Sequence, residues 1–341
     1  MSCEIVRLKS FCSVVDKELV PPQLNPFYAN FIDSDVDTCY TIYNEDKNNS
    51  RIKEQLNFVL MKRPYGTFLV SMPYIGYGSC LDVNNKKHLK ELFFELERFA
   101  VEHGCLTMSF CNHPLSNINF NDMKHVFGYS FSHNSTCQIS FLDVHPLEKL
   151  SHKRRSAFKN EISKSVKAGF SIVKKPDRDM FNSWYDVYVS RFNDIDAVSN
   201  SKKFFLGLYN ESVRNHDVDF WVVKDDNVVV GGVFFEKGKG IVDYTTSAFL
   251  TSYHKFFPTT FLLDNYFDSI IGSMSYFNWQ GSGGNDGVFN YKRRWGAVCY
   301  DQFYYAKNLV PLKRITSIPL EIIKSDLFRC FVLPYSLWEG C

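Results

Sequence analysis

The order hairpin, helix, strand occurs twice in this sequence, and the two copies lie about 160 residues apart. Apolar periodicity predicts the two hairpin strands, helix and final strand of the first copy over Phe58–Met61, Thr67–Met72, about Lys86–His103 and Leu106–Phe110. It predicts three strands, a helix and a final strand of the second copy over Phe220–Val223, Val228–Phe235, Ile241–Thr246, about Pro258–Ile271 and Tyr276–Gln280. The copies share almost no residue identity, so the repeat is one of architecture. The predicted fold class is α/β (α+β), with two units of mixed, partly splayed sheets.

Length and composition agree with two globular domains. The 341 residues correspond to roughly two domains of about 100–200 residues each, and 45 % of them are hydrophobic. A net charge of +2, with 18 Gly and 12 Pro, excludes collagen-like, mucin-like and disordered chains. No apolar run reaches the roughly 20 residues of a membrane span, and the N-terminus has no signal-peptide pattern. We therefore expect a soluble, cytoplasmic protein without a transmembrane segment.

Ten cysteines are spread along the chain, and none of them shows Cys-x-x-Cys or other zinc-ligand spacing. Several lie in apolar, strand-like runs, where a free thiol behaves as a small hydrophobic side chain. We expect structural thiols in a reducing compartment and no bound metal.

The segment Ser151–Lys175 carries most of the charge asymmetry. It holds eight basic residues and one acid, so it carries +7 and leaves −5 on the rest of the chain. Its pattern predicts a helix that starts at Ser151 and has Phe158, Ile162 and Val166 as its apolar stripe. The basic face is either a solvated surface or a site for the phosphates of a nucleotide-linked substrate or of RNA.

A glycine-rich turn, Gly281–Gly287, follows a predicted strand and precedes a predicted helix over Val288–Trp295. The third glycine of a dinucleotide fingerprint is replaced by Asp286, and the Gly-Lys-Ser/Thr of a P-loop is missing. The turn is either a flexible connection or an anion site, because helix N-termini offer free N–H groups. Lys292 and two arginines follow within two helical turns.

The segment Gly287–Ala297 reads G-V-F-N-Y-K-R-R-W-G-A and resembles a signature of the FemAB/FemX-like family, a branch of the GNAT superfamily of N-acetyltransferases. Leu69–Gly78 and His152–Gly169 resemble two further segments of that family. The resemblance spans roughly Phe58–Tyr305. It implies two tandem GNAT-like domains, with the C-terminal tail returning to the first. The expected boundaries are 1–148 plus 318–341 for the acceptor-side domain and 149–317 for the donor-side, catalytic domain.

The resemblance also implies an activity, namely transfer of an acyl or aminoacyl group to an amine. The acceptor would be a nucleotide- or lipid-linked cell-envelope precursor, either an amino sugar or polysaccharide or a peptidoglycan peptide. The donor would be an acyl-CoA, another acyl thioester or an aminoacyl-tRNA, bound through its acceptor end. Such an acceptor leaves peripheral membrane contact open.

By motif, Lys292 matches the family lysine that stabilises negative charge on the donor or at the tetrahedral intermediate, and we expect it in the first turns of its helix. Asp243 and Tyr244 are the candidates for the base that deprotonates the amine. They point to opposite sides of one strand, so only one can face the cleft, and Tyr244 is favoured. The side chains expected to hold phosphates or contact substrate are Lys153, Arg154, Arg155, Arg191, Gln280, Ser282, Arg293 and Arg294.

Two departures from the family pattern support the first of two alternatives and argue against CoA binding of the usual kind. The loop Thr251–Pro258 lacks the glycines with which ordinary GNAT enzymes bind the CoA pyrophosphate, and Asn278 stands where relatives often have an acid. One alternative is a non-catalytic, polyanion-binding module with a degenerate GNAT fold. The other is an ordinary acetyl-CoA-dependent N-acetyltransferase.

Overall fold

The structure, a computed structural model, describes residues 2–11, 17–46, 51–73, 86–116, 120–195, 199–214, 217–327, 333 and 335–338. Residues 74–78 of the second family-like segment lie outside this range, as do Cys12, Cys80, Cys330 and Cys341. The described cysteines are free thiols, and burial raises the pKa of Cys105 to about 12. None of the helices in these ranges is both long enough and apolar enough to span a membrane.

The chain divides into two units, Met1–Ser135 with Asp301–Cys341, and Thr136–Tyr300. Two strands run from one unit into the other, β6 (Phe131–Phe141) and β12 (Val298–Asn308). The boundaries expected from the resemblance, 148/149 and 317/318, lie beyond the ends of these two strands. Polar residues interrupt the apolar pattern of both β6 and β12, so periodicity does not reveal these strands.

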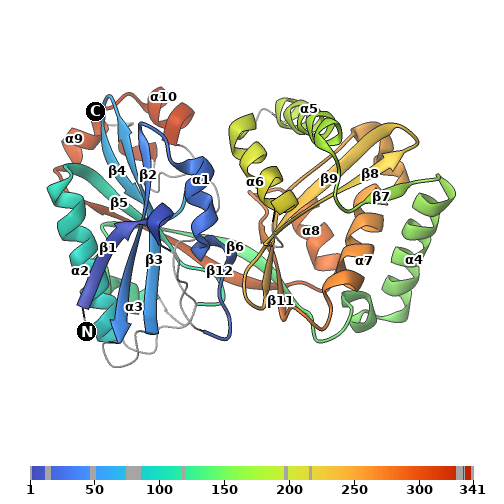
Figure 1. Ribbon diagram of the computed structural model, residues 1–341, viewed down its shortest axis with the longest axis horizontal. Coiled ribbons are helices and arrows are strands. Elements are labelled where there is room, and N and C mark those ends of the chain that lie inside the picture. The colour runs from blue at the N-terminus through green and yellow to red at the C-terminus, as the bar shows by residue number, and fades with distance from the viewer. Residues whose placement is uncertain are drawn as a thin grey trace. The chain divides into compact units, whose positions relative to one another are not determined.

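Unit 1 contains a sheet in the order β1-β2-β3-β4-β5-β12. The remaining strand bounds are β1 (Ser2–Arg7), β2 (Asp37–Asp46), β3 (Arg51–Arg63), β4 (Gly66–Val70) and β5 (Cys105–Cys111). Among the described strand pairs of unit 1, only β4–β5 is parallel, and helix α2 (Lys86–Glu102) connects its strands. Helices α2 and α3 (Phe120–Val126) cover one face and the short α1 (Ala29–Ile32) lies on the other (Figure 1).

Unit 2 repeats this plan. Its strands follow the order β6-β11-β10-β9-β8-β7. The strand bounds are β7 (Ser171–Val173), β8 (Val218–Asp225), β9 (Val228–Lys237), β10 (Ile241–Phe249) and β11 (Tyr276–Gly281). Of the strand pairs that the structure describes in unit 2, only β10–β11 is parallel, and α7 (Pro258–Ile270) connects its strands. The expected repeat of a strand, a crossover helix and a parallel strand is therefore confirmed.

Helices cover both faces of the unit 2 sheet (Figure 1). Helices α4 (His152–Lys167), α7 and α8 (Asp286–Arg294) cover one face, and their apolar side chains join a core that includes Phe158, Phe267 and Trp295. Helices α5 (Arg178–Asp194) and α6 (Lys202–Arg214) cover the other, where the rings of Trp184 and Phe205 pack against Phe234. Burial on both faces is what makes the central strands read as continuous apolar runs.

The apolar stripe of α4 differs from the predicted one. Phe158 is buried as expected, but Val166 is 58 % exposed and Ser165 is fully buried in its place. The reason is the helical period of 3.6 residues, which brings the seventh residue after Phe158 closer to the core than the eighth. Ser165 Oγ lies 2.6 Å from the carbonyl oxygen of Phe256 and 3.1 Å from that of Phe257. Ser151 is the N-cap residue, but its side chain makes no cap hydrogen bond.

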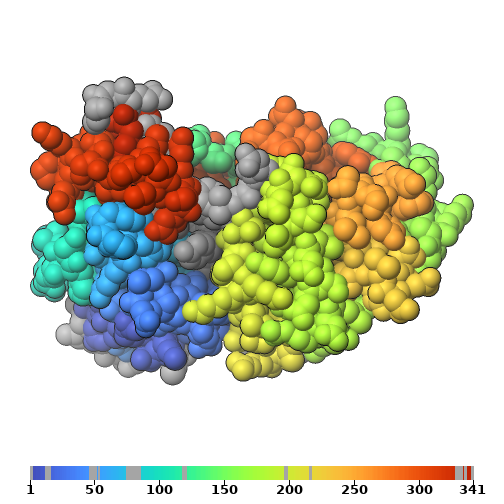
Figure 2. Space-filling model, turned by 90° about the horizontal axis from the view of Figure 1, so that it is seen from above, coloured from blue at the N-terminus to red at the C-terminus, as the bar shows by residue number. Residues whose placement is uncertain are grey.

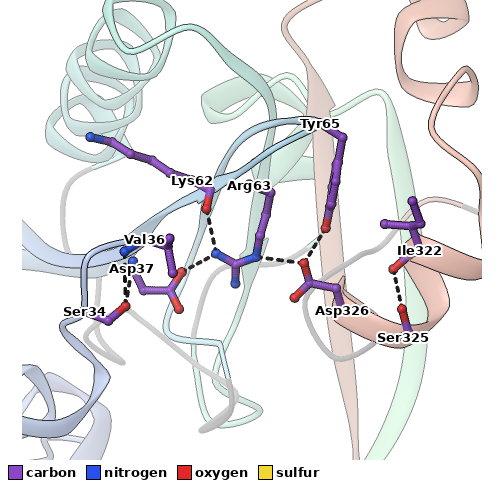
Figure 3. A network of polar contacts seen from close by, with 9 residues as sticks. All are labelled: Ser34, Val36, Asp37, Lys62, Arg63, Tyr65, Ile322, Ser325 and Asp326. Carbon is purple, nitrogen blue, oxygen red and sulfur yellow. Dashed lines mark hydrogen bonds and ion pairs between the residues drawn. The ribbon is translucent and has the colours of Figure 1, made fainter.

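The segment after β12 packs onto unit 1, as expected for the tail. It contains α9 (Leu312–Thr316), α10 (Leu320–Ile322) and a π-helical turn over Ile323–Leu327. In Figure 2 this red segment lies beside the cyan residues of unit 1. Arg63 in the β3–β4 hairpin donates from Nη1 to Asp37 (2.7 Å) and from Nε to Asp326 (2.9 Å), and the Tyr65 hydroxyl also donates to Asp326 (2.5 Å; Figure 3).

Candidate functional site

The parallel strands β10 and β11 part in the middle of unit 2. Their pairing runs from Ile241–Tyr276 to Asp243–Asn278 and ends there, whereas β10 continues beside β9 to Phe249. Both strands are irregular at this level. The β10–β9 register shifts just after Tyr244, and the β11–β6 register shifts just after Asn278. The partly splayed sheet expected from the sequence is thus present, and its opening starts beside Asp243.

A buried polar group lies where the strands part. Asp243 and Asn278 are fully buried on neighbouring strands. Asn278 Nδ2 donates to Asp243 Oδ1 at 3.0 Å, and Gln280 Nε2 donates to Asp243 Oδ2 at 2.9 Å. Each carboxylate oxygen of Asp243 therefore accepts a hydrogen bond from a side-chain amide.

Asn278 also connects β11 with β6. Its Oδ1 accepts from Cys137 Sγ at 3.0 Å and from the main-chain N–H of Gln280 at 3.0 Å. Gln280 has φ 62°, in the left-handed region that side-chain-bearing residues seldom adopt. The irregular end of β11 is thus fixed by a side chain of the same strand and by a neighbour from β6.

Lys292 of α8 is connected to this buried polar group through Gln280. It is 3 % exposed, and its Nζ donates to the carbonyl oxygens of Gln280 (3.1 Å) and Gly281 (2.7 Å). Among the described residues, no carboxylate lies within ion-pair distance of it. Burial lowers the pKa of Lys292 from its usual 10.5 to about 8, an effect that the nearby Cys137 opposes. A buried ammonium beside an opening in the sheet is suited to stabilising an oxyanion.

The position of Lys292 within its helix differs from the expected one. Asn285 Oδ1 accepts from the N–H of Val288, so α8 begins at Asp286 and ends at Arg294. Lys292 therefore lies in the last turn and not in the first turns. A cation is favoured there, because the partial negative charge of the helix dipole is at this end.

Tyr244 and Asp243 occupy opposite faces of β10, in agreement with strand alternation. The ring of Tyr244 lies 5.7 Å from that of Trp279 and 6.1 Å from that of Phe277, within the aromatic core. Burial raises the pKa of Tyr244 well above its usual value, which keeps its hydroxyl protonated. Of the two, Asp243 is the one bonded to Gln280, whose carbonyl oxygen accepts from Lys292.

The arginines expected to hold phosphates mostly bind other parts of the protein. Arg155 donates to the carbonyl oxygens of Leu147 (3.0 Å) and Glu148 (2.6 Å), which lie within the 3-10 turn Pro146–Lys149. Arg191 Nη1 lies 3.2 Å from both the Asp194 carboxylate and the Thr251 hydroxyl. Both guanidinium groups thus contribute to local structure.

The remaining candidates divide between the site and the surface. Arg294 pairs with Glu161 and lies 4.7 Å from the ring centre of Phe158, whereas Arg293 is exposed over its helix neighbour Phe289. Ser282 Oγ donates to Gln138 Oε1 at 3.2 Å, which attaches the glycine-rich turn to β6. The other two candidates, Lys153 and Arg154, are exposed at the start of α4.

The glycine-free loop forms a 3-10 helix over Thr251–Phe256. Phe257 follows with φ 60° and is the N-cap residue of α7. Ser165 of α4 bonds to the carbonyl oxygens at this junction. A packed 3-10 turn and the Ser165 hydroxyl therefore shape this loop.

Sequence patterns do not reveal the contributions of Cys137 and Gln138. Both belong to β6, whose pairing with β11 joins segments about 140 residues apart. No motif surrounds them, and their only signal is a polar pair within a mixed run. Their role follows from topology alone.

Solved structures resemble this chain over most of its length. FemX matches with a TM-score of 0.67 at 11 % identity, over 85 % of this chain and 93 % of FemX. L-PGS from Bacillus licheniformis matches with a TM-score of 0.53 at 13 % identity, over 84 % and 89 %. A tandem GNAT protein from the clavulanic acid biosynthesis pathway matches with a TM-score of 0.52 at 10 % identity, over 84 % and 87 %. No protein-family model and no curated protein matches the sequence. The FemX-like, tandem GNAT fold expected from the sequence is confirmed.

Proposed function

We propose that the chain is an N-acyltransferase whose reaction takes place in unit 2, where β10 and β11 part. One observation carries this proposal: a FemX-like fold places a buried lysine, Lys292, at the opening of the sheet. Burying an ammonium costs several kcal/mol unless it is compensated, so a buried lysine on two main-chain carbonyls points to a role beyond solubility.

The chemistry follows from the groups present. The nitrogen of the acceptor amine attacks the acyl carbon, a C–N bond forms, and the carbonyl oxygen gains negative charge. Lys292 stabilises that oxyanion, and the bond from the acyl carbon to the carrier's sulfur or oxygen then breaks. The amine proton goes to a base, and the leaving thiolate or alkoxide is protonated in turn. Asp243 is the base we favour from its hydrogen bonds, and Tyr244 stays the second candidate.

Charge on α4 supports a phosphate-bearing substrate. Lys153 and Arg154 are exposed, as are Lys159, Lys164 and Lys167 further along this helix. A phosphate-rich carrier or acceptor would be attracted to such a face. We propose a nucleotide- or lipid-linked cell-envelope precursor as acceptor, with an acyl thioester or aminoacyl-tRNA as donor, in the cytoplasm.

The test is a transfer assay by mass spectrometry, with acyl-CoA and aminoacyl-tRNA donors and nucleotide-linked amino sugars and peptides as acceptors. Lys292→Ala should lower turnover by about two orders of magnitude, comparable to the loss of an oxyanion donor. Lys203→Ala, an exposed lysine of α6 outside the basic face of α4, is the matched control and should retain turnover. Full turnover in Lys292→Ala would contradict the assignment.

A second candidate function is that of a polyanion-binding module. It is favoured by the exposed basic face of α4 together with the glycine-free loop that ends at Phe257. A module of this kind would bind RNA with a steep dependence on salt and yield no product. An ordinary acetyl-CoA-dependent enzyme would instead be stabilised by CoA thioesters in thermal unfolding.

A further inference from the structure

Gln280 uses every one of its polar main-chain groups, and its side-chain amide nitrogen, within the site. Its N–H donates to Asn278 Oδ1 at 3.0 Å, and its carbonyl oxygen accepts from Lys292 Nζ at 3.1 Å. Its side-chain Nε2 donates to Asp243 Oδ2 at 2.9 Å. One residue thus touches both the ammonium and the carboxylate to which the reaction is assigned.

The backbone conformation of Gln280 makes this arrangement possible. Pairing with β10 ends at Asn278, so the carbonyls of Gln280 and Gly281 do not continue that ladder. Lys292 Nζ donates to both of these carbonyl oxygens. The left-handed φ of 62° directs the Gln280 carbonyl to Lys292 while its side chain stays with Asp243. A left-handed residue other than glycine costs about 1 kcal/mol or more, which indicates that the side chain is needed there.

We propose that Gln280 is a positioning residue that couples Lys292 to Asp243, through its main-chain carbonyl on one side and its side-chain amide on the other. The inference rests on the proposed function in treating those two groups as reactive. Gln280 itself does not need to touch substrate. Its carbonyl sets the position of the ammonium, and its amide sets the orientation of the carboxylate.

Two other titratable groups face this pair. Glu236 of β9 is fully buried and lies directly opposite Asp243 in the antiparallel ladder. Cys137 of β6 bonds to Asn278 and lies close enough to Lys292 to influence its charge. Both remain in place when Gln280 is changed, so a difference between variants reports on Gln280.

The test replaces Gln280 by glycine. Gln280→Gly retains the left-handed turn without steric cost and keeps the carbonyl for Lys292, but it removes the amide from Asp243. With ¹³C-labelled Asp and Lys, NMR should show the Asp243 carboxyl titrating about one pH unit higher than in the unaltered chain, since a donor to the charged form is lost. The Lys292 side chain should still titrate near pH 8.

Gln138→Ala is the matched control, because it removes another amide of the site, one bonded to Phe289 and Ser282. It should leave the Asp243 midpoint unchanged. An unchanged Asp243 midpoint in Gln280→Gly would overturn the coupling, and so would a Lys292 midpoint that moves although its carbonyl is retained. In the transfer assay, the acidic limb of the pH–rate profile should move upward with Asp243. Absence of transfer in the unaltered chain would reject the proposed function and leave the NMR result standing.

Discussion

At the scale of single residues, the ammonium of Lys292 is held in a poorly solvated place by main-chain oxygens. Two carbonyl dipoles and the end of the α8 dipole stabilise its charge, but they do not replace its full hydration. The balance favours the neutral amine, so the pKa falls to about 8. Lys292 therefore changes charge close to physiological pH.

This shift predicts a pH-dependent stability. Between the folded-state pKa of about 8 and the unfolded value of 10.5, the unfolded chain binds the proton and the folded chain does not. The free energy of unfolding must therefore rise with pH across this window, by about 3 kcal/mol in total from this one group. The variant Lys292→Met lacks the contribution.

Urea unfolding of both proteins at several pH values checks the prediction. From pH 7.5 to pH 10.5, the unaltered chain should gain about 3 kcal/mol relative to Lys292→Met. Tyrosines that titrate above pH 10 contribute equally to both proteins and cancel in the difference. A constant difference across the window would show that Lys292 is solvated.

The sequence singles out both Lys292 and Gln280, but it assigns Gln280 to substrate contact and not to the positioning role proposed for it. A motif identifies the lysine, because its spacing from the glycine-rich turn is local. The role of Gln280 depends on a register shift between β11 and β6 and on where β10 leaves β11. Those events are set by long-range pairing, which the sequence near Gln280 does not encode.

At the scale of elements, Ser165 of α4 makes a polar contact with the residues at the start of α7. Ser165→Ala should remove it and leave the carbonyls of Phe256 and Phe257 without this hydroxyl. We expect a loss of about 1–2 kcal/mol in the free energy of unfolding, because a buried acceptor then loses its donor. Chemical denaturation measures the loss.

Ser163→Ala on the same helix is the matched control, since Ser163 is exposed. It should change stability by less than about 0.5 kcal/mol. Equal effects of the two substitutions would mean that helix propensity, and not the Ser165 contact, determines the result. Binary patterning predicts the helix, but it places Val166 and not Ser165 in the buried stripe. It does so because it depends on side-chain polarity and takes no account of which residue faces the core.

At the scale of the whole molecule, one arginine joins the hairpin of unit 1 to the C-terminal segment. Arg63 lies between Asp37 and Asp326, and its side chain is 9 % exposed (Figure 3). A double-mutant cycle with Arg63→Met and Asp326→Asn should give a coupling of about 1 kcal/mol, reduced by high salt because Asp326 is partly exposed.

Limited proteolysis gives an independent readout of that contact. Asp326→Asn should increase cleavage after α10, whereas Asp143→Asn, an exposed acid of unit 2 paired with Lys149, should not. A coupling near zero together with unchanged cleavage would show that apolar contacts alone hold the segment. The apolar contacts include the fully buried Ile315 and Ile323.

The tandem plan could be predicted from the sequence because each copy repeats local signals, an amphipathic helix between apolar strands. The unit boundaries could not be predicted in this way. β6 and β12 alternate poorly and acquire their place only through partners far along the chain, such as β5 for β12.

The division of unit 1 between two chain segments has a consequence for biosynthesis. Unit 2 is continuous and can fold as soon as residue 300 has left the ribosome. Until β12 has been made, the edge of strand β5 that faces away from β4 stays unpaired. Of the two units, the one translated first is therefore completed last, and its β5 edge stays open to pairing with other strands until β12 is made.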